Sequence, residues 1–115
     1  MLILPMRKCL LCILLLALPF SASAQRLECP PFNGATRNVL VNARLFDGPV
    51  AEQVELAPDN EEGATWDIRG YKDTGRSLIL LCEYKNRTSL QVSVHHAANR
   101  CTFRGDKKRS AWCGK

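Results

Sequence analysis

The sequence predicts a small, mainly β domain that follows a secretory signal peptide. Apolar residues alternate with other residues over several short segments, which is the pattern of half-buried strands. No segment of the mature chain sustains a 3.6-residue period. Four cysteines remain once the leader is removed, an even number that predicts two disulfides in a small exported domain. We therefore expect a small antiparallel sheet or barrel-like domain cross-linked by two disulfides.

Residues 1–24 have the three zones of a cleavable signal peptide. Arg7 and Lys8 supply the positive charge, an apolar run follows over residues 9–18, and residues 22–24 read Ala-Ser-Ala. Cleavage there makes Gln25 the new N-terminus and leaves residues 25–115 as one small domain. The apolar run is too short for a transmembrane helix, which needs about 20 residues. The sequence thus predicts a periplasmic or secreted protein without a transmembrane anchor in the mature chain.

The mature chain has a mild positive charge. Because Arg7 and Lys8 leave with the leader, 14 Lys and Arg remain against 11 Asp and Glu, and the net charge falls from +5 to +3. This charge is too small and too evenly spread to favour a nucleic-acid partner. The only cluster is Lys107-Lys108-Arg109, and we interpret it as a solvated turn between two strands rather than a docking patch.

The first half of the mature chain contains three candidate strands. The segment 39–46 is apolar and β-branched, and Asp47-Gly48-Pro49 ends it. Shorter alternating segments follow at 54–56 and 66–68, separated by the polar loop 58–63. Regular alternation in the first strand places four residues on one face: Val39, Val41, Ala43 and Leu45.

A hairpin over residues 78–96 has the clearest pattern. One face of its first strand carries Leu78, Leu80, Cys82 and Tyr84, and one face of its second carries Leu90, Val92, Val94 and His96. A three-residue loop at 86–88 makes the apolar faces coincide. That loop pairs Lys85 with Ser89, Tyr84 with Leu90, Cys82 with Val92 and Leu80 with Val94. Because Ile79 and Leu81 are also apolar, we expect the first strand to be central.

A last hairpin over residues 101–113 suggests the disulfide pairing. Cys101 and Cys113 are symmetric about Lys107, so a turn over 106–108 places them opposite each other, close to bridging distance. Cys29 then pairs with Cys82 by elimination. The main alternative pairs Cys82 with Cys101 and Cys29 with Cys113. A zinc site made from these thiols with His95 and His96 is disfavoured, because the mature chain has no Cys-x-x-Cys pair.

No residue set in the sequence predicts catalysis or a cofactor. His95 and His96 are adjacent, so on a regular strand they point to opposite faces. The serines lie in no nucleophile motif, and the carboxylates of the Asp59–Glu62 loop are typical of a solvated turn. Three aromatic side chains could stack on sugars, although we expect them in the core or at its edge: Trp66, Tyr71 and Trp112.

Five segments together resemble a group of small uncharacterised exported proteins of Gram-negative bacteria. They are Cys29-Pro30, residues 45–49 (LFDGP), residues 66–71 (WDIRGY), residues 81–84 (LCEY) and Arg100-Cys101. The resemblance implies a periplasmic, disulfide-bonded β domain and no site residues. A looser similarity links the chain to periplasmic lysozyme inhibitors of the small β-barrel type, although their C-terminal inhibitory motif is not clearly present.

The sequence favours a non-enzymatic binding protein of the bacterial envelope. The compact cross-linked scaffold and the lack of a catalytic set support this reading, with a protein or a glycan as the partner. The first alternative is an inhibitor of a cell-wall hydrolase of the lysozyme type. The second is a small hydrolase that uses loop carboxylates.

Overall fold

A computed structural model describes residues 27–60, 64–71, 74–95, 97–106 and 108–115. The signal peptide predicted at 1–24 and the new terminus Gln25 lie outside the described residues. The described residues form nine strands: β1 Leu27–Glu28, β2 Phe32–Asn33, β3 Ala35–Asp47, β4 Glu55–Leu56, β5 Ala64–Asp67, β6 Leu78–Tyr84, β7 Ser89–Ser93, β8 Arg100–Arg104 and β9 Ser110–Gly114. Two single-turn 3₁₀ helices also occur, η1 Val50–Glu52 and η2 Arg69–Tyr71. The prediction of a mainly β domain is confirmed.

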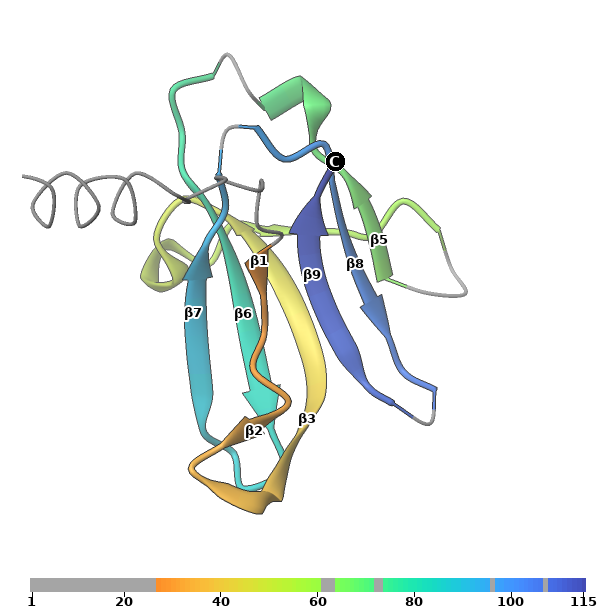
Figure 1. Cartoon of the computed structure of the whole chain (residues 1–115). Coiled ribbons are helices and arrows are strands. Elements are labelled where there is room, and N and C mark those ends of the chain that lie inside the picture. The colour runs from red at the N-terminus through yellow and green to blue at the C-terminus, as the bar shows by residue number, and fades with distance from the viewer. Residues whose placement is uncertain (1–26, 61–63, 72–73, 96, 107) are drawn as a thin grey trace, which may run out of the picture.

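The strands form two antiparallel sheets (Figure 1). One has the order β1-β9-β8-β5, and the other the order β2-β3-β6-β7, with β4 paired to β3. Side chains from both sheets meet in one buried cluster, so the domain has two layers over a shared core. The three strands expected in the first half of the chain correspond to β3, β4 and β5.

Strand β6 is the centre of the core. Leu78, Leu80, Cys82 and Tyr84 are all buried on one face, as the alternation predicts. Leu81 on the other face is buried as well, because β6 lies between β3 and β7. Each side chain of this size that leaves water stabilises the fold by about 1.5–3 kcal/mol.

Strand β3 departs from the regular alternation that the sequence predicts. It is longer than expected, and its pairing with β6 shifts register between Leu40 and Asn42, so that Val41 is an extra residue. A bulge of this kind reverses which residues face the core on one side of it. Leu40, Ala43 and Leu45 are therefore buried, whereas Val39 and Val41 are only half-buried. The single face predicted for Val39, Val41, Ala43 and Leu45 is wrong for its first half.

The β6–β7 hairpin also differs from the predicted register. Cys82 lies opposite Leu90 and Leu80 opposite Val92, two residues away from the expected pairing. The turn begins one residue earlier, because the Arg87 amide donates to the Tyr84 carbonyl at 2.9 Å and the Tyr84 amide donates to the Thr88 carbonyl at 3.0 Å. Arg87 takes the left-handed conformation (φ 71°) that this hairpin needs. A shift of two residues keeps the same faces together, so Leu90, Val92 and Val94 still pack on the core.

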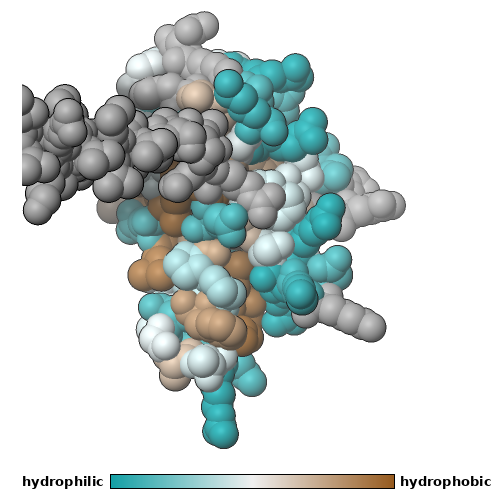
Figure 2. Space-filling model, in the orientation of Figure 1, coloured by the Kyte–Doolittle hydropathy of each residue, from teal (hydrophilic) through white to brown (hydrophobic). Residues whose placement is uncertain are grey.

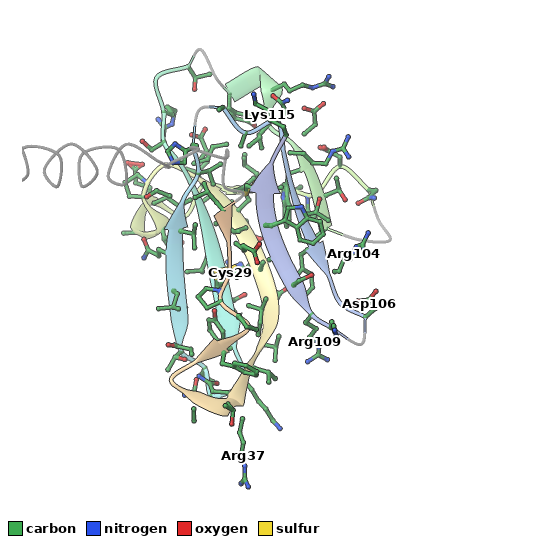
Figure 3. All side chains as sticks on the ribbon, in the orientation of Figure 1. Cys29, Arg37, Arg104, Asp106, Arg109 and Lys115 are labelled. Carbon is green, nitrogen blue, oxygen red and sulfur yellow. A yellow bond between two sulfur atoms is a disulfide. The ribbon has the colours of Figure 1, made fainter. Side chains whose placement is uncertain are left out.

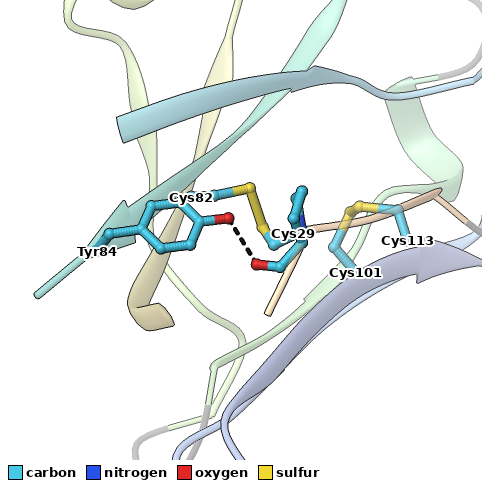
Figure 4. Close-up of a disulfide and its surroundings, with 6 residues drawn as sticks. Cys29, Cys82, Tyr84, Cys101 and Cys113 are labelled. Carbon is cyan, nitrogen blue, oxygen red and sulfur yellow. Dashed lines mark hydrogen bonds between the residues drawn. A yellow bond between two sulfur atoms is a disulfide. The ribbon is translucent and has the colours of Figure 1, made fainter. Parts of the chain in front are cut away.

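The two disulfides are Cys29–Cys82 and Cys101–Cys113, the pairing that the sequence analysis favours over its alternative (Figure 4). Cys101 lies opposite Cys113 in the β8–β9 hairpin, in the register centred on residue 107. Cys29 follows β1, and its amide donates to the Ala111 carbonyl of β9 at 2.9 Å. The Cys29–Cys82 bond therefore links the two sheets, whereas Cys101–Cys113 lies within one of them.

Candidate functional site

A groove opens between the two sheets at one end of the domain. Its volume is about 700 Å³. One wall is mainly apolar and comes from β2, β3 and the residue before β2, namely Pro31, Phe32, Val39 and Leu40. The other wall is polar and comes from the β8–β9 turn and the start of β9, namely Asp106, Lys108, Arg109 and Ser110. Figure 2 shows hydrophobic surface over the β2–β3 region, with hydrophilic side chains toward the β8–β9 hairpin.

The apolar wall is held against the core by several bonds. The Tyr84 hydroxyl donates to the Pro30 carbonyl at 2.6 Å, next to the Cys29–Cys82 bond (Figure 4). One residue further on, the Pro31 carbonyl accepts a hydrogen bond from the Leu40 amide at 3.1 Å. The chain from Cys29 to Pro31 is thus fixed at three consecutive residues, which determines where Phe32 lies.

Phe32 is the exposed large hydrophobic side chain of this wall. It lies opposite Val39 in the β2–β3 pair, and 44 % of its surface is exposed. The buried side chain of Asn38 holds the neighbouring segments, since its amide nitrogen donates to the Asn33 carbonyl and its oxygen accepts from the Asn86 amide. The exposure of Phe32 is therefore set by a hydrogen-bonded framework and not by a loose chain end.

The polar wall carries cations without a compensating carboxylate contact. Lys108 and Arg109 are exposed and form no hydrogen bond or ion pair with other described residues. Figure 3 shows Asp106 and Arg109 near the tip of the β8–β9 hairpin, with Arg109 on the side toward β3. The turn predicted at Lys107-Lys108-Arg109 is solvent-exposed at its described residues, and these also line the groove. Lys107 itself lies outside the described residues.

Three other arginines in the described part of the chain have carboxylate partners. Arg44 contacts Glu55 at 2.7 Å, Arg76 contacts Asp47 at 2.6 Å and Arg69 contacts Asp67 at 2.7 Å. The hydrogen bond from the Arg69 side chain, more than any other cause, lowers the pKa of Asp67 to about 2. The Arg44–Glu55 and Arg69–Asp67 pairs are exposed, so each contributes little to stability. All three pairs do neutralise their own cations, whereas Lys108 and Arg109, like Arg37 and Arg100, form no ion pair with other described residues.

A second, smaller cleft lies at the opposite end of β8. It has a volume of about 260 Å³ and is lined by Asp67, Arg69, Asn99, Arg100 and Lys115. The Asp67 carboxylate lies among its cations, and its lining has no large apolar side chain. This cleft therefore offers less to a partner than the groove does.

Among the described residues, those considered for catalysis form no shared site. His95 is exposed, and His96 lies outside the described residues. The Asp59 carboxylate accepts a hydrogen bond from the Asp67 amide, so it organises its own loop, while Glu61 and Glu62 lie outside the described residues. Within the described ranges, no group of three His, Cys, Asp or Glu side chains could hold a metal ion.

The large aromatic side chains mostly pack in the core or at its edge. Trp66 is buried and donates its indole N–H to the Leu56 carbonyl at 2.9 Å. Tyr71 is half-buried against the same core. Trp112 is half-buried with the Arg104 guanidinium over its ring, 5.6 Å from the centroid. Trp66 thus has no face free for a sugar, as expected for a core residue.

Comparison with known protein families identifies the chain. Residues 35–114 match the family described as Type VI secretion system Tli immunity protein. The matched span begins at the first residue of β3 and ends at the last residue of β9. The chain belongs to the Tli immunity protein family. Comparison with curated proteins and with solved structures found no match. Among the described residues, no helix has the length and apolar character needed to cross a membrane.

Membership of this family agrees with the predicted class of small binding protein and is more specific than the resemblances found in the sequence. Local sequence patterns contain no signal for the groove, because its two walls come from segments about 70 residues apart that belong to different sheets. The one local sign is the cluster at 107–109, and the position of Lys108 and Arg109 opposite an apolar wall depends on the fold.

Proposed function

We propose that this chain is a non-enzymatic immunity protein that protects its own cell by binding a toxin delivered by a Type VI secretion system. The match over residues 35–114 carries the proposal, because it covers strands β3 to β9 and both walls of the groove apart from Pro31 and Phe32. An immunity protein of this size acts by occupying the toxin, so its partner is a protein.

The compartment follows from the leader and the cysteines. The signal peptide directs the chain out of the cytoplasm, and the two disulfides form and persist in an oxidising compartment. The periplasm meets both conditions and is where an incoming toxin would first be exposed to such a protein. We therefore place the encounter between the two proteins in the periplasm.

The features of the groove support binding rather than catalysis. It combines exposed apolar surface with charged side chains at its rim, which is the usual composition of a protein-binding surface. The sequence also suggests an inhibitor of a cell-wall hydrolase. That function is the special case of immunity in which the toxin is an enzyme that attacks the cell wall.

A contact-dependent competition experiment tests this function. A recipient that lacks the gene is grown on a surface with its parent strain as the attacker, and recipient survival is counted. We expect the recipient to lose viability and to recover it when it carries the full-length chain. An attacker with an inactive secretion apparatus serves as the control and should kill neither recipient.

A second recipient carries the chain without residues 1–24. We expect no rescue, because the protein then stays in the reducing cytoplasm. Equal survival of the gene-lacking recipient with active and inactive attackers would contradict the immunity function. Full rescue by the leaderless chain would contradict the periplasmic encounter.

A further inference from the structure

We propose that the groove is the toxin-binding surface, and that it receives a segment of the toxin that presents an apolar side chain beside carboxylates. This inference rests on the proposed function and adds the surface and the chemistry of the partner. It follows from three features of the groove: an exposed apolar anchor point, cations without an ion pair among the described residues, and an apolar wall that is held in place.

Phe32 supplies the apolar anchor point. Only two large apolar side chains in the described residues are exposed, Phe32 and Val54, each with 44 % of its surface in water. Phe32 lines a groove beside Pro31 and Val39, whereas Val54 precedes β4 near the other end of β3. An aromatic residue in a concave apolar site is the typical centre of a protein interface. We therefore expect an apolar side chain of the toxin to pack on Phe32.

Lys108 and Arg109 define the charge of the partner. They face the apolar wall across the groove and have no carboxylate contact among the described residues, although Asp106 lies in the same turn. Arg44, Arg69 and Arg76 have such contacts already. A carboxylate beside the toxin's apolar side chain would pair with the groove cations and raise the association rate. The partner segment is therefore acidic next to its apolar residue.

The apolar wall is fixed before the toxin arrives, and the two strands that carry the polar wall are cross-linked. The Cys29–Cys82 bond and the Tyr84–Pro30 hydrogen bond hold the apolar wall, and the Cys101–Cys113 bond joins the two strands that carry the polar wall. A site that is already ordered loses less conformational entropy when it binds. This suits a protein that must capture a toxin quickly at low concentration.

The test compares matched pairs of variants in the recipient of the competition experiment. Phe32→Ala is matched with Val54→Ala, because the two side chains have the same exposed fraction. The double variant Lys108→Glu/Arg109→Glu is matched with Arg100→Glu/Lys115→Glu, which makes the same charge change at the other end of the β8–β9 hairpin. Thermal unfolding and the periplasmic amount are measured for each variant.

We expect both groove variants to reduce recipient survival by roughly tenfold or more, as the loss of an interface anchor does. The two control variants should protect as well as the natural chain. All four change exposed side chains, so their unfolding temperatures should stay close to that of the natural chain. If one groove variant is nevertheless unstable, the other still tests the same surface.

The outcomes separate the two proposals. If the natural chain protects and both stable groove variants protect equally well, the groove is not the toxin-binding surface, while the immunity function stands. If the Arg100/Lys115 variant alone loses protection, the toxin binds at the smaller cleft and the groove inference is wrong. If the natural chain itself gives no protection, the proposed function fails first.

Discussion

The Tyr84 hydroxyl donates a 2.6 Å hydrogen bond to the carbonyl of Pro30, from the centre of one sheet to the segment that precedes β2. Tyr84 is buried, and in the same strand Cys82 bonds to Cys29, next to Pro30 in the chain. One strand thus holds two consecutive residues of the N-terminal segment. Phe32 follows two residues after Pro30, so this contact positions the apolar wall of the groove.

Replacing Tyr84 by Phe removes this hydrogen bond and leaves the ring. We expect the free energy of unfolding to fall by about 1 kcal/mol, the usual net contribution of a hydrogen bond, with some addition because the Pro30 carbonyl loses its partner. Urea unfolding of the oxidised protein measures the change. An unchanged midpoint would show that the bond contributes nothing in solution.

The same hydroxyl predicts a pH dependence at alkaline pH. Burial raises the pKa of Tyr84 above its ordinary value of 10.0. Because the folded state holds the proton more tightly, this contribution to stability is fully present below the pKa of the unfolded chain and is lost as the pH rises through the higher folded pKa. We expect the natural chain to lose more stability than Tyr84→Phe above pH 10, measured by thermal unfolding. Parallel pH curves would contradict this assignment.

The two disulfides should differ in their effect on stability. Cys29 and Cys82 are 53 residues apart, whereas Cys101 and Cys113 are 12 apart. In the loop-entropy account, their loss costs about 4 and about 3 kcal/mol, respectively. We expect the double variant Cys29→Ser/Cys82→Ser to unfold at lower denaturant than Cys101→Ser/Cys113→Ser. Peptide mapping without reduction checks the pairing, and a peptide that joins Cys82 to Cys101 would contradict it.

Strand β7 is an edge strand and should show alternating protection of its amides. The hydrogen bonds Tyr84–Thr88 and Val94–Leu78 flank the strand, so the backbone groups of Leu90 and Val92 face β6. Those of Ser89, Gln91 and Ser93 face outward. We expect slow hydrogen exchange at Leu90 and Val92 and fast exchange at the other three. Uniform protection would mean that the edge is covered in solution.

An NMR contact fixes the register of the same hairpin. Leu81 and Gln91 form a non-hydrogen-bonded pair, where Cα atoms lie about 4.5 Å apart. We therefore expect a strong Hα–Hα contact between these two residues. A strong Hα–Hα contact between Leu81 and Ser93 instead would contradict this register. It would support the register predicted from the sequence, in which the loop spans residues 86–88.

The sequence predicts those parts of the fold that follow from regular alternation. The symmetry of Cys101 and Cys113 about residue 107 predicts their hairpin, and the apolar residues of β6 predict its central place. The bulge at Val41 has no sequence signal, because a β-branched residue fits a regular strand equally well. The position of the β6–β7 turn is not apparent from the sequence, because the left-handed conformation that Arg87 adopts there is usually marked by Gly or Asn.

The groove could not be predicted from local patterns. Phe32 occurs in a two-residue strand that alternation cannot detect, and its exposure depends on bonds to Pro30 and Pro31 from β6 and β3. The sequence shows that Lys108 and Arg109 belong to a basic cluster, but a turn predicted from sequence does not indicate which surface it faces in the folded chain. Only the packing of the two sheets places these cations across from the apolar wall.

Site-specific photo-crosslinking during attack tests the central claim most directly. A photoreactive phenylalanine analogue replaces Phe32 in one recipient and Val54 in another, and recipients are irradiated while in contact with attackers. We predict an adduct between position 32 and a protein that the attacker delivers, absent with an inactive secretion apparatus and absent at position 54. An adduct at position 54 alone, or no adduct at position 32 in a recipient that is still protected, would contradict binding of the toxin in the groove.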